Sequence, residues 1–94
     1  STTDEEINAF YLIKSILRTK IQLARLSFRD SVNYFSVILD ENNRKPICRL
    51  WLNSQNKKYI GLFDKEKKEV KNEINTIDDI YNFSAQLLET IDYY

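Results

Sequence analysis

The sequence lacks several residue types on which common protein chemistries depend. It contains no histidine and one cysteine, Cys48. The absence of histidine excludes Ser-His-Asp and Cys-His catalysis, histidine-bound metals and a histidine proton shuttle near neutral pH. A lone cysteine allows neither an intrachain disulfide nor a cysteine-based zinc site. Because an unpaired thiol is typical of reducing compartments, we expect the protein to be cytoplasmic.

Glycine and proline are equally scarce, with one of each in 94 residues. The single glycine, Gly61, excludes a glycine-rich phosphate loop and a dinucleotide-binding fingerprint. No apolar run approaches the roughly 18 residues that a membrane span needs, so we expect no membrane partner. Methionine is absent too, and we interpret the chain as a piece excised from a longer protein.

The hydrophobic periodicity predicts a helix at each end of one domain spanning residues 1–94. Residues 3–6 form a capping box, and the apolar spacing that follows predicts a helix to about residue 19. Residues 76–79 repeat the capping pattern before a second apolar stripe that ends at Ile91.

Between these helices the period changes to two, which predicts about five short strands. We place them at residues 24–29, 34–39, 45–53, 58–63 and 69–74. The intervening residues 40–43, 54–56 and 64–68 have the composition of turns. Because the connections are short, we expect an antiparallel meander with both helices packed on one face, which is a two-layer α+β fold.

Charges of the two signs are separated along the chain although the formal net charge is zero. Residues 14–58 hold ten lysines and arginines against three acids, a net charge of +7. Residues 72–94 hold five acids and no basic residue. The predicted sheet is therefore basic, whereas the ends of the chain are acidic.

Strand parity indicates which side chains share a face of the sheet. Along residues 47–53 the even-numbered side chains should face the helices and the odd-numbered ones should face away. The face away from the helices would then collect arginines and large apolar or aromatic residues, namely Arg25, Arg29, Tyr34, Ile38, Ile47, Arg49, Trp51 and Tyr59. Arginines interleaved with aromatic rings on an open sheet bind phosphates and stack on bases in nucleic-acid-binding proteins.

Two other interpretations of this face remain open. In a structural one, Trp51 and Ile47 pack under a loop or a neighbouring domain, and Arg49 lies over an aromatic ring or pairs with Asp30 or Asp40. In the other, the same residues contact a partner protein or a second copy of the chain, since Trp and Arg are common interface anchors.

Two Glu-x-Lys triplets, at residues 66–68 and 69–71, lie downstream of Asp40. Restriction-type nucleases use an acid and such a triplet to hold Mg²⁺ and position a water. Because these triplets fall in a lysine-rich turn, we interpret them as a solvated hairpin. Cys48 has inward parity and is interpreted as a core residue. We therefore expect no catalytic residue, no metal site and no cofactor.

Residues 40–50 (DENNRKPICRL), residues 57–64 (KKYIGLFD) and residues 78–81 (DDIY) resemble the C-terminal segment of bacterial proteins related to type I restriction enzyme R subunits. The resemblance covers essentially the whole chain. It implies a bacterial, DNA-directed parent whose PD-(D/E)XK nuclease motif lies in an N-terminal domain outside these residues. No catalytic residue of the family is carried over to this chain.

We therefore expect a non-catalytic accessory domain of a restriction-endonuclease-like protein that contacts DNA through its basic sheet side. The expected DNA-contacting residues are Arg25, Arg29, Arg44, Lys45, Arg49, Trp51, Lys57 and Lys58, with Tyr34 as a second stacking candidate. Most of the affinity would come from neutralised phosphates. The alternative is a protein–protein interaction or dimerisation module that docks through residues 47–51 on the parent nuclease domain or on another copy of the chain.

Overall fold

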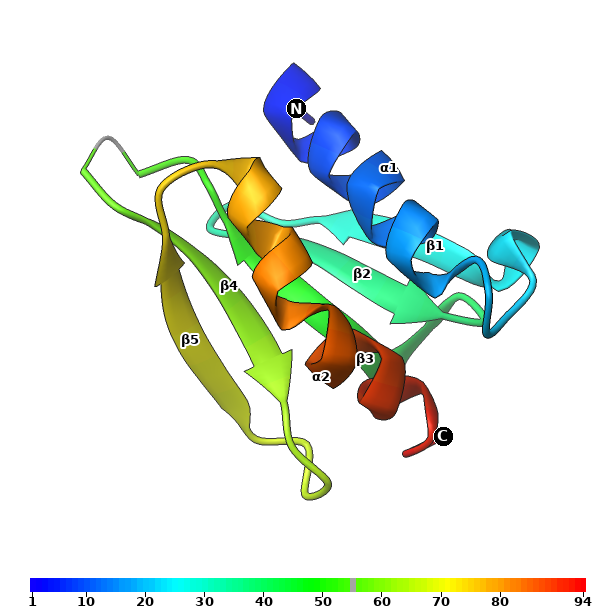
Figure 1. The fold of residues 1–94 in the computed structure, drawn as a ribbon. Helices are drawn as coiled ribbons and strands as arrows, with labels where there is room; N and C mark the ends of the chain where they lie inside the picture. The colour runs from blue at the N-terminus through cyan, green and yellow to red at the C-terminus, as the bar shows by residue number, and fades with distance from the viewer. Residues whose placement is uncertain (55) are drawn as a thin grey trace.

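Two helices cover one face of a five-stranded sheet in the computed structural model, which describes residues 1–54 and 56–94 (Figure 1). The elements are α1 (Asp4–Leu17), η1 (Leu23–Arg25), β1 (Leu26–Asp30), β2 (Phe35–Leu39), β3 (Asn42–Trp51), β4 (Lys58–Phe63), β5 (Glu69–Ile74), η2 (Ile77–Phe83) and α2 (Ser84–Ile91), where η marks a 3₁₀ helix. None of the helices in the described ranges is long and apolar enough to cross a membrane.

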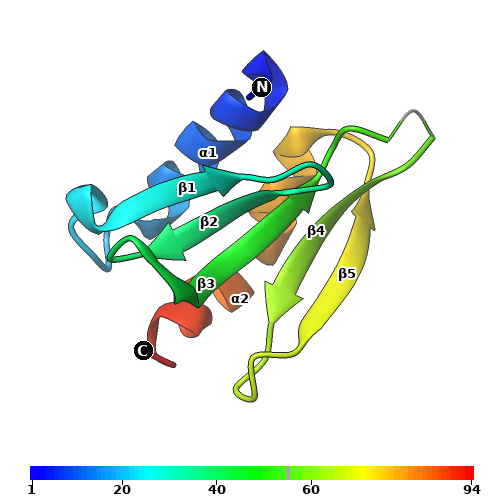
Figure 2. The ribbon, with the colours of Figure 1, turned by 180° about the vertical axis from the view of Figure 1, so that it is seen from behind.

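The strands follow one another across the sheet in chain order, and each neighbouring pair is antiparallel. Seen from behind, the sheet lies in front and both helices lie beyond it (Figure 2). The predicted two-layer α+β meander is therefore confirmed. Strands β4 and β5 have the predicted bounds, and β1 and β5 form the two edges of the sheet.

The capping box that was predicted for α1 is present. The Oγ1 of Thr3 accepts a hydrogen bond from the Glu6 amide at 3.1 Å, and the Glu6 carboxylate accepts one from the Thr3 amide at 3.0 Å. These two bonds satisfy amide donors that the first turn of a helix otherwise leaves unpaired. The helix ends at Leu17, two residues before the predicted end.

The second helical segment begins at the predicted cap but is not α-helical throughout. Asp79 accepts a hydrogen bond from the Thr76 amide at 3.2 Å, as a capping box requires. The residues Ile77–Phe83 then form a 3₁₀ helix, and only Ser84–Ile91 is α-helical. The sequence IDDIYNF accounts for this, because it consists of β-branched, aromatic and short polar residues with low α-helix propensity.

The hydrophobic core lies between the sheet and the helices. Its fully buried members come from every layer of the fold and include Ile13, Leu17, Phe35, Val37, Ile47, Cys48, Leu50, Ile60, Ile80 and Leu87. The prediction that Cys48 belongs to the core is confirmed. Burial in this apolar setting raises the pKa of the Cys48 thiol, with a smaller contribution from the negative charge of Glu69.

The prediction that Ile47 faces away from the helices is wrong. Cys48 pairs with Val37 and Pro46 pairs with Ile38, so Ile47 is an extra residue on β3 with no partner on β2. Such a bulge breaks the alternation of side chains along a strand. Ile47 and Cys48 are consequently both fully buried in the core.

The strands near the β2–β3 turn also differ from their predicted bounds. Strand β1 begins at Leu26 because the residues before it form the 3₁₀ helix η1. Strand β3 begins at Asn42 because Asp40 and Glu41 make a two-residue turn by themselves, with φ angles of 56° and 54°. Two successive positive φ angles are typical of the tight turns that match the twist of a hairpin. The predicted turn at residues 54–56 includes Gln55, which lies outside the described residues.

The Thr3→Ala substitution tests how much the cap of α1 contributes. We expect it to lower the free energy of unfolding by about 1 kcal/mol, because the Glu6 amide loses its side-chain acceptor. Urea denaturation followed by circular dichroism measures the change. Thr2→Ala is the matched control, since the Thr2 hydroxyl only donates to Asp30 at an exposed position. Equal losses in the two variants would contradict the capping role.

Candidate functional site

The face of the sheet turned away from the helices holds the predicted aromatic and basic residues of β3. Arg49 pairs with Gly61 and Trp51 pairs with Tyr59, while their neighbour Leu50 faces the core. Because paired residues point to the same side of a sheet, one surface joins β3, β4 and β5. We call it the outer face, and its residues include Arg29, Ser36, Arg49, Trp51, Tyr59, Gly61, Phe63, Glu69, Lys71 and Glu73. The predicted outward orientation of Arg49 and Trp51 is thus confirmed.

Glu69 connects the two predicted residues on this face. One carboxylate oxygen accepts a hydrogen bond from Arg49 Nη1 at 3.0 Å, and the other accepts one from Trp51 Nε1 at 2.7 Å. The carboxylate reaches across β4 through the space above Gly61, where any Cβ would collide with it. The only glycine of the chain therefore has a packing role, because it leaves room for this ion pair.

Aromatic rings hold the cations of the outer face in place. The guanidinium carbon of Arg49 lies 4.6 Å from the centroid of the Tyr34 ring and 5.3 Å from that of Phe63. The Nζ of Lys71 lies 3.4 Å from the centroid of the Trp51 indole. Cations over ring faces are attracted by the ring quadrupole. A base could stack on that side of Trp51 only if Lys71 moved away.

A polar hollow of about 400 Å³ lies beside these stacks. We define the polar hollow by its lining residues, which are Arg29, Asp30, Ser31, Tyr34, Ser36, Asn43 and Arg49. The Nη1 of Arg29 donates a hydrogen bond to the Phe28 carbonyl oxygen at 3.1 Å. The Nε of Arg49 is buried and has no hydrogen-bond partner among the residues described. The hollow thus combines two guanidinium groups and the carboxylate of Asp30 with hydroxyl and amide groups.

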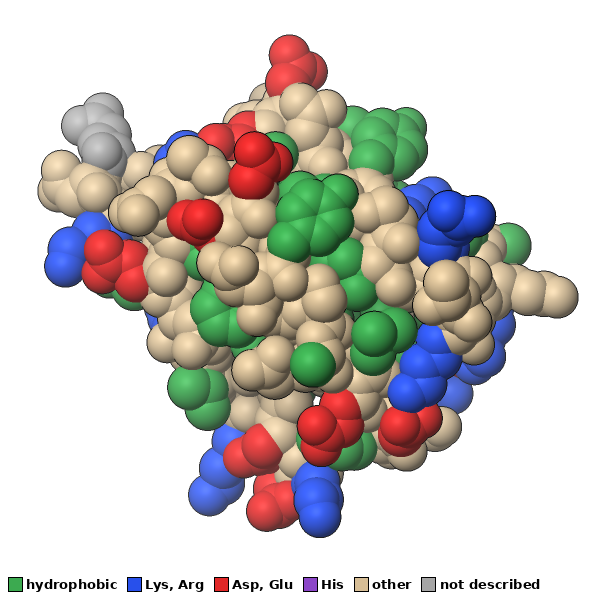
Figure 3. Space-filling model, viewed as in Figure 1, with side chains coloured by type: hydrophobic (Ala, Val, Ile, Leu, Met, Phe, Trp, Pro, Cys, Tyr) green, Lys and Arg blue, Asp and Glu red, His purple; other side chains and the backbone are tan. Residues whose placement is uncertain are grey.

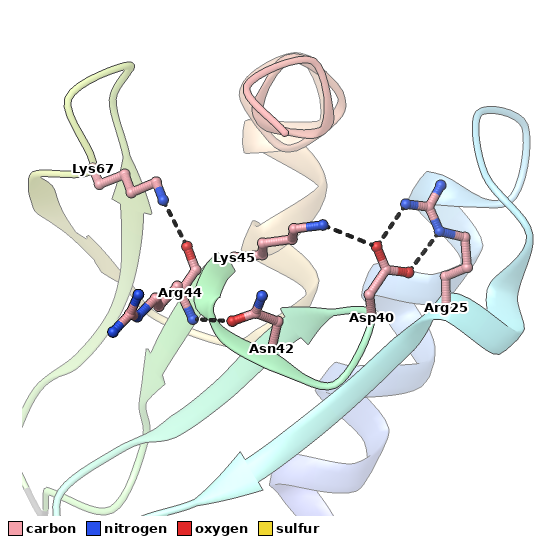
Figure 4. A network of polar contacts seen from close by, with 6 residues as sticks. All are labelled: Arg25, Asp40, Asn42, Arg44, Lys45 and Lys67. Carbon is pink, nitrogen blue, oxygen red and sulfur yellow. Dashed lines mark hydrogen bonds and ion pairs between the residues drawn. The ribbon is translucent and has the colours of Figure 1, made fainter.

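Arg25 and Lys45 lie elsewhere, at the turn between β2 and β3 (Figure 4). Arg25 belongs to η1 and not to β1, so its predicted place on the outer face is wrong. Its Nε and Nη2 atoms donate to the two oxygens of Asp40 at 2.7 and 2.8 Å, and Lys45 lies 3.4 Å from the same carboxylate. The hydrogen bond from Arg25 is the main cause that lowers the pKa of Asp40 to about 2.

The other predicted basic residues are also dispersed. Lys58 pairs with Glu5 at the beginning of α1, and Lys57 lies 3.5 Å from Glu73 on β5. The side chain of Arg44 is exposed, while its backbone carbonyl accepts from Lys67 (Figure 4). In the described part of the chain, five of the seven basic candidates are therefore paired with acids. The exceptions are Arg29 and Arg44.

This pairing cancels the separation of charge seen along the sequence. Glu5, Glu69 and Glu73 all come from outside the basic stretch 14–58, yet each neutralises a cation within it. On the side covered by the helices, acidic and basic side chains are likewise intermixed around the rim (Figure 3). Of the predicted basic side chains, only Arg29 and Arg49 line the polar hollow.

The residues of the two Glu-x-Lys triplets are engaged in other contacts. Asp40 binds Arg25 and Lys45, and Glu69 binds Arg49 and Trp51. Residues 64–68 form an exposed turn in which Asp64 accepts from two backbone amides, so the interpretation as a solvated hairpin is confirmed for the first triplet. The second triplet lies in β5, where the Glu69 side chain is largely shielded from solvent. Among the described residues, no three or more acids or cysteines are grouped so that they could hold a metal ion.

Comparison with protein-family models, with curated proteins and with solved structures finds nothing that matches this chain. Any functional conclusion therefore depends on the geometry of the site and on the sequence itself. Sequence reasoning missed Glu69 and Lys71 as partners of Arg49 and Trp51. The alternation of side chains along β4 puts Tyr59 and Phe63 on the outer face. If the same alternation is continued across the β4–β5 hairpin, Glu69 and Lys71 fall on that face too.

The Arg25→Gln substitution tests the cause of the low pKa of Asp40. We expect this pKa to rise from about 2 toward its ordinary value, because Arg25 makes the larger contribution and Lys45 remains. A lowered folded-state pKa means that the stabilisation is present above the unfolded pKa and is lost as the pH falls toward 2. An NMR titration of the Asp40 carboxyl measures the shift. Lys45→Gln is the control and should raise the pKa less.

The Gly61→Ala substitution tests the position of Glu69. The added methyl group would displace the Glu69 carboxylate, so Trp51 would lose its acceptor and its indole N–H signal would move upfield. Trp51 is the only tryptophan, which makes this NMR signal unambiguous. We expect the free energy of unfolding to fall by about 1–3 kcal/mol, since a charge-assisted bond is lost. Val70→Ala, at an exposed neighbouring position, should leave the indole signal in place. An unchanged signal in Gly61→Ala would refute the arrangement.

Proposed function

We propose that this chain is a non-catalytic accessory domain that contacts DNA through the outer face of its sheet. The observation that carries the proposal is the polar hollow, where Arg29 and Arg49 lie together beside the aromatic side chain of Tyr34. On the basis of the resemblance in residues 40–50, we further propose that the parent is a bacterial, cytoplasmic, restriction-endonuclease-like protein with its nuclease site in another domain.

The chemistry of the hollow suits phosphate oxygens. A guanidinium presents several N–H donors in one plane and binds phosphate in a fork geometry. Ser31, Ser36 and Asn43 add neutral donors around the two arginines. Tyr34 and Trp51, whose ring centroids are 5.0 Å apart, supply aromatic surface next to the hollow on which a base could stack once Lys71 moves.

The ion pairs limit how many phosphates this domain can neutralise. Arg25, Lys45, Lys57 and Lys58 would each have to leave an acid before they could bind DNA, whereas Arg49 would bind through the donors that Glu69 does not occupy. With Arg29 and Arg49 as the main contacts, about two phosphates are neutralised at most. The logarithm of the affinity should then fall with the logarithm of the salt concentration with a slope of about −1.4 for single-stranded and about −1.8 for duplex DNA.

A fluorescence titration with labelled single-stranded and duplex DNA at low salt tests the proposal. We expect binding that weakens about tenfold or more in Arg29→Gln and in Arg49→Gln, because each removes charge-assisted bonds of about 1.5–3 kcal/mol. Arg18→Gln is the matched control, since it removes the same charge from an exposed position at the end of α1. The proposal fails if neither DNA form binds, or if binding is indifferent to salt and to both outer-face variants.

The alternative is a protein–protein interaction module, and one observation favours it. Trp51, Tyr34 and Arg49 are half-buried. Glu69 holds Trp51 and Arg49, and Tyr34 packs against both of them, while the ion pairs leave little free charge nearby. Pre-ordered Trp, Tyr and Arg side chains are typical anchors of protein interfaces. Absence of DNA binding, together with a dimer in light scattering that dissociates in Trp51→Ala, would favour this second function.

A further inference from the structure

We infer that the polar hollow binds a single terminal phosphate group, a phosphomonoester, in preference to a run of backbone phosphates. The inference rests on the proposed DNA contact, because it concerns the same arginines, and it names the group that they recognise. It depends on the dispersal of the other predicted basic residues, on the donors inside the hollow and on the way Glu69 and the aromatic rings hold Arg49.

The distribution of cations argues against a track along the nucleic-acid backbone. One strand of DNA places a phosphate about every 3.4 Å along the helix axis, so a protein that follows it needs a row of cations. In the part of the chain that the structure describes, Lys57 and Lys58 near one end of the sheet and Lys45 near the β2–β3 turn are paired with acids. Arg29 and Arg49 meet at one point, which suits one phosphate group.

The donors inside the hollow match a phosphomonoester better than a diester. A terminal phosphate carries a charge of about −1.5 to −2 and has three acceptor oxygens, whereas a backbone diester carries one charge on two free oxygens. Arg29, which pairs with no acid among the described residues, supplies a positive charge, and Arg49 adds N–H donors although it shares its charge with Glu69. The hydroxyl and amide groups of Ser31, Ser36 and Asn43 offer donors for the additional oxygen.

Arg49 is held in place before any ligand arrives. Its Nη1 is bound to Glu69, its guanidinium lies against the Tyr34 and Phe63 rings, and its Nε has no partner among the described residues. A fixed donor loses little conformational freedom on binding, which favours affinity for a small anion. Asp30 is the acidic member of the lining, and one of its oxygens accepts from the Thr2 hydroxyl at 2.8 Å.

The test compares single-stranded oligonucleotides of one sequence with a 5′-phosphate, with a 3′-phosphate, or with hydroxyl groups at both ends, each labelled internally. We expect one phosphorylated form to bind about tenfold more tightly than the unphosphorylated form, which corresponds to about 1.4 kcal/mol. This preference should be lost in Arg49→Gln and in Arg29→Gln and retained in Arg18→Gln. Arg29→Gln keeps the test decisive if Arg49→Gln unfolds, since Arg29 is exposed and does not contact Glu69.

A second titration adds inorganic phosphate and follows the NMR signals of Arg29 and Arg49. It distinguishes a site for free phosphate from a site for the terminal phosphate of an oligonucleotide. Shifts in these signals without any oligonucleotide binding would support the phosphate site and overturn the proposed DNA contact. Equal binding of all three oligonucleotides would support the DNA contact and overturn the terminal-phosphate inference. Absence of binding to every ligand would overturn both.

Discussion

The outer face of this domain depends on one carboxylate, that of Glu69. It reaches from β5 across β4 and accepts hydrogen bonds from Arg49 and Trp51 on β3, so a single side chain connects three strands. Gly61 leaves the space for it. Because the carboxylate is shielded, with 16% of the side chain exposed, its bonds to these groups are stronger than those of a solvated ion pair. The orientation of Arg49 over Tyr34, and with it the shape of the polar hollow, follows from this contact.

Ion pairs between residues far apart in the sequence also set the distribution of charge elsewhere on the described surface. Acids from α1 and β5 lie against cations from the basic stretch of the sequence, as Glu5 does with Lys58. Each exposed pair contributes little to stability. Their effect on recognition is larger, because paired cations are less available to a ligand. Among the predicted basic residues, Arg29 and Arg49 are the two that converge on the polar hollow.

Much of the fold could be read from local patterns, whereas the content of the outer face could not. The alternation of apolar and polar residues predicted β4 and β5, and the capping box predicted the beginning of α1. Both signals depend only on residues that are close together in the chain. The same alternation failed at Ile47, where a bulge against β2 inserts one extra residue into β3. It failed for Arg25 as well, because η1 occupies Leu23–Arg25 and β1 begins at Leu26, two residues later than predicted. The first error arises from the pairing of β3 with β2, and the second from the 3₁₀ helix that precedes β1.

The sequence by itself determined the order of helices and strands, the inward position of Cys48 and the absence of histidine chemistry, because these depend on residue type and on spacing along the chain. Only the tertiary structure decided which charges neutralise one another, and that Glu69, far from Arg49 in sequence, is its partner. The physical reason is that Coulomb and hydrogen-bond energies depend on distance in space. The register of the hairpins sets the distance between these charges, and this register cannot be read from the composition.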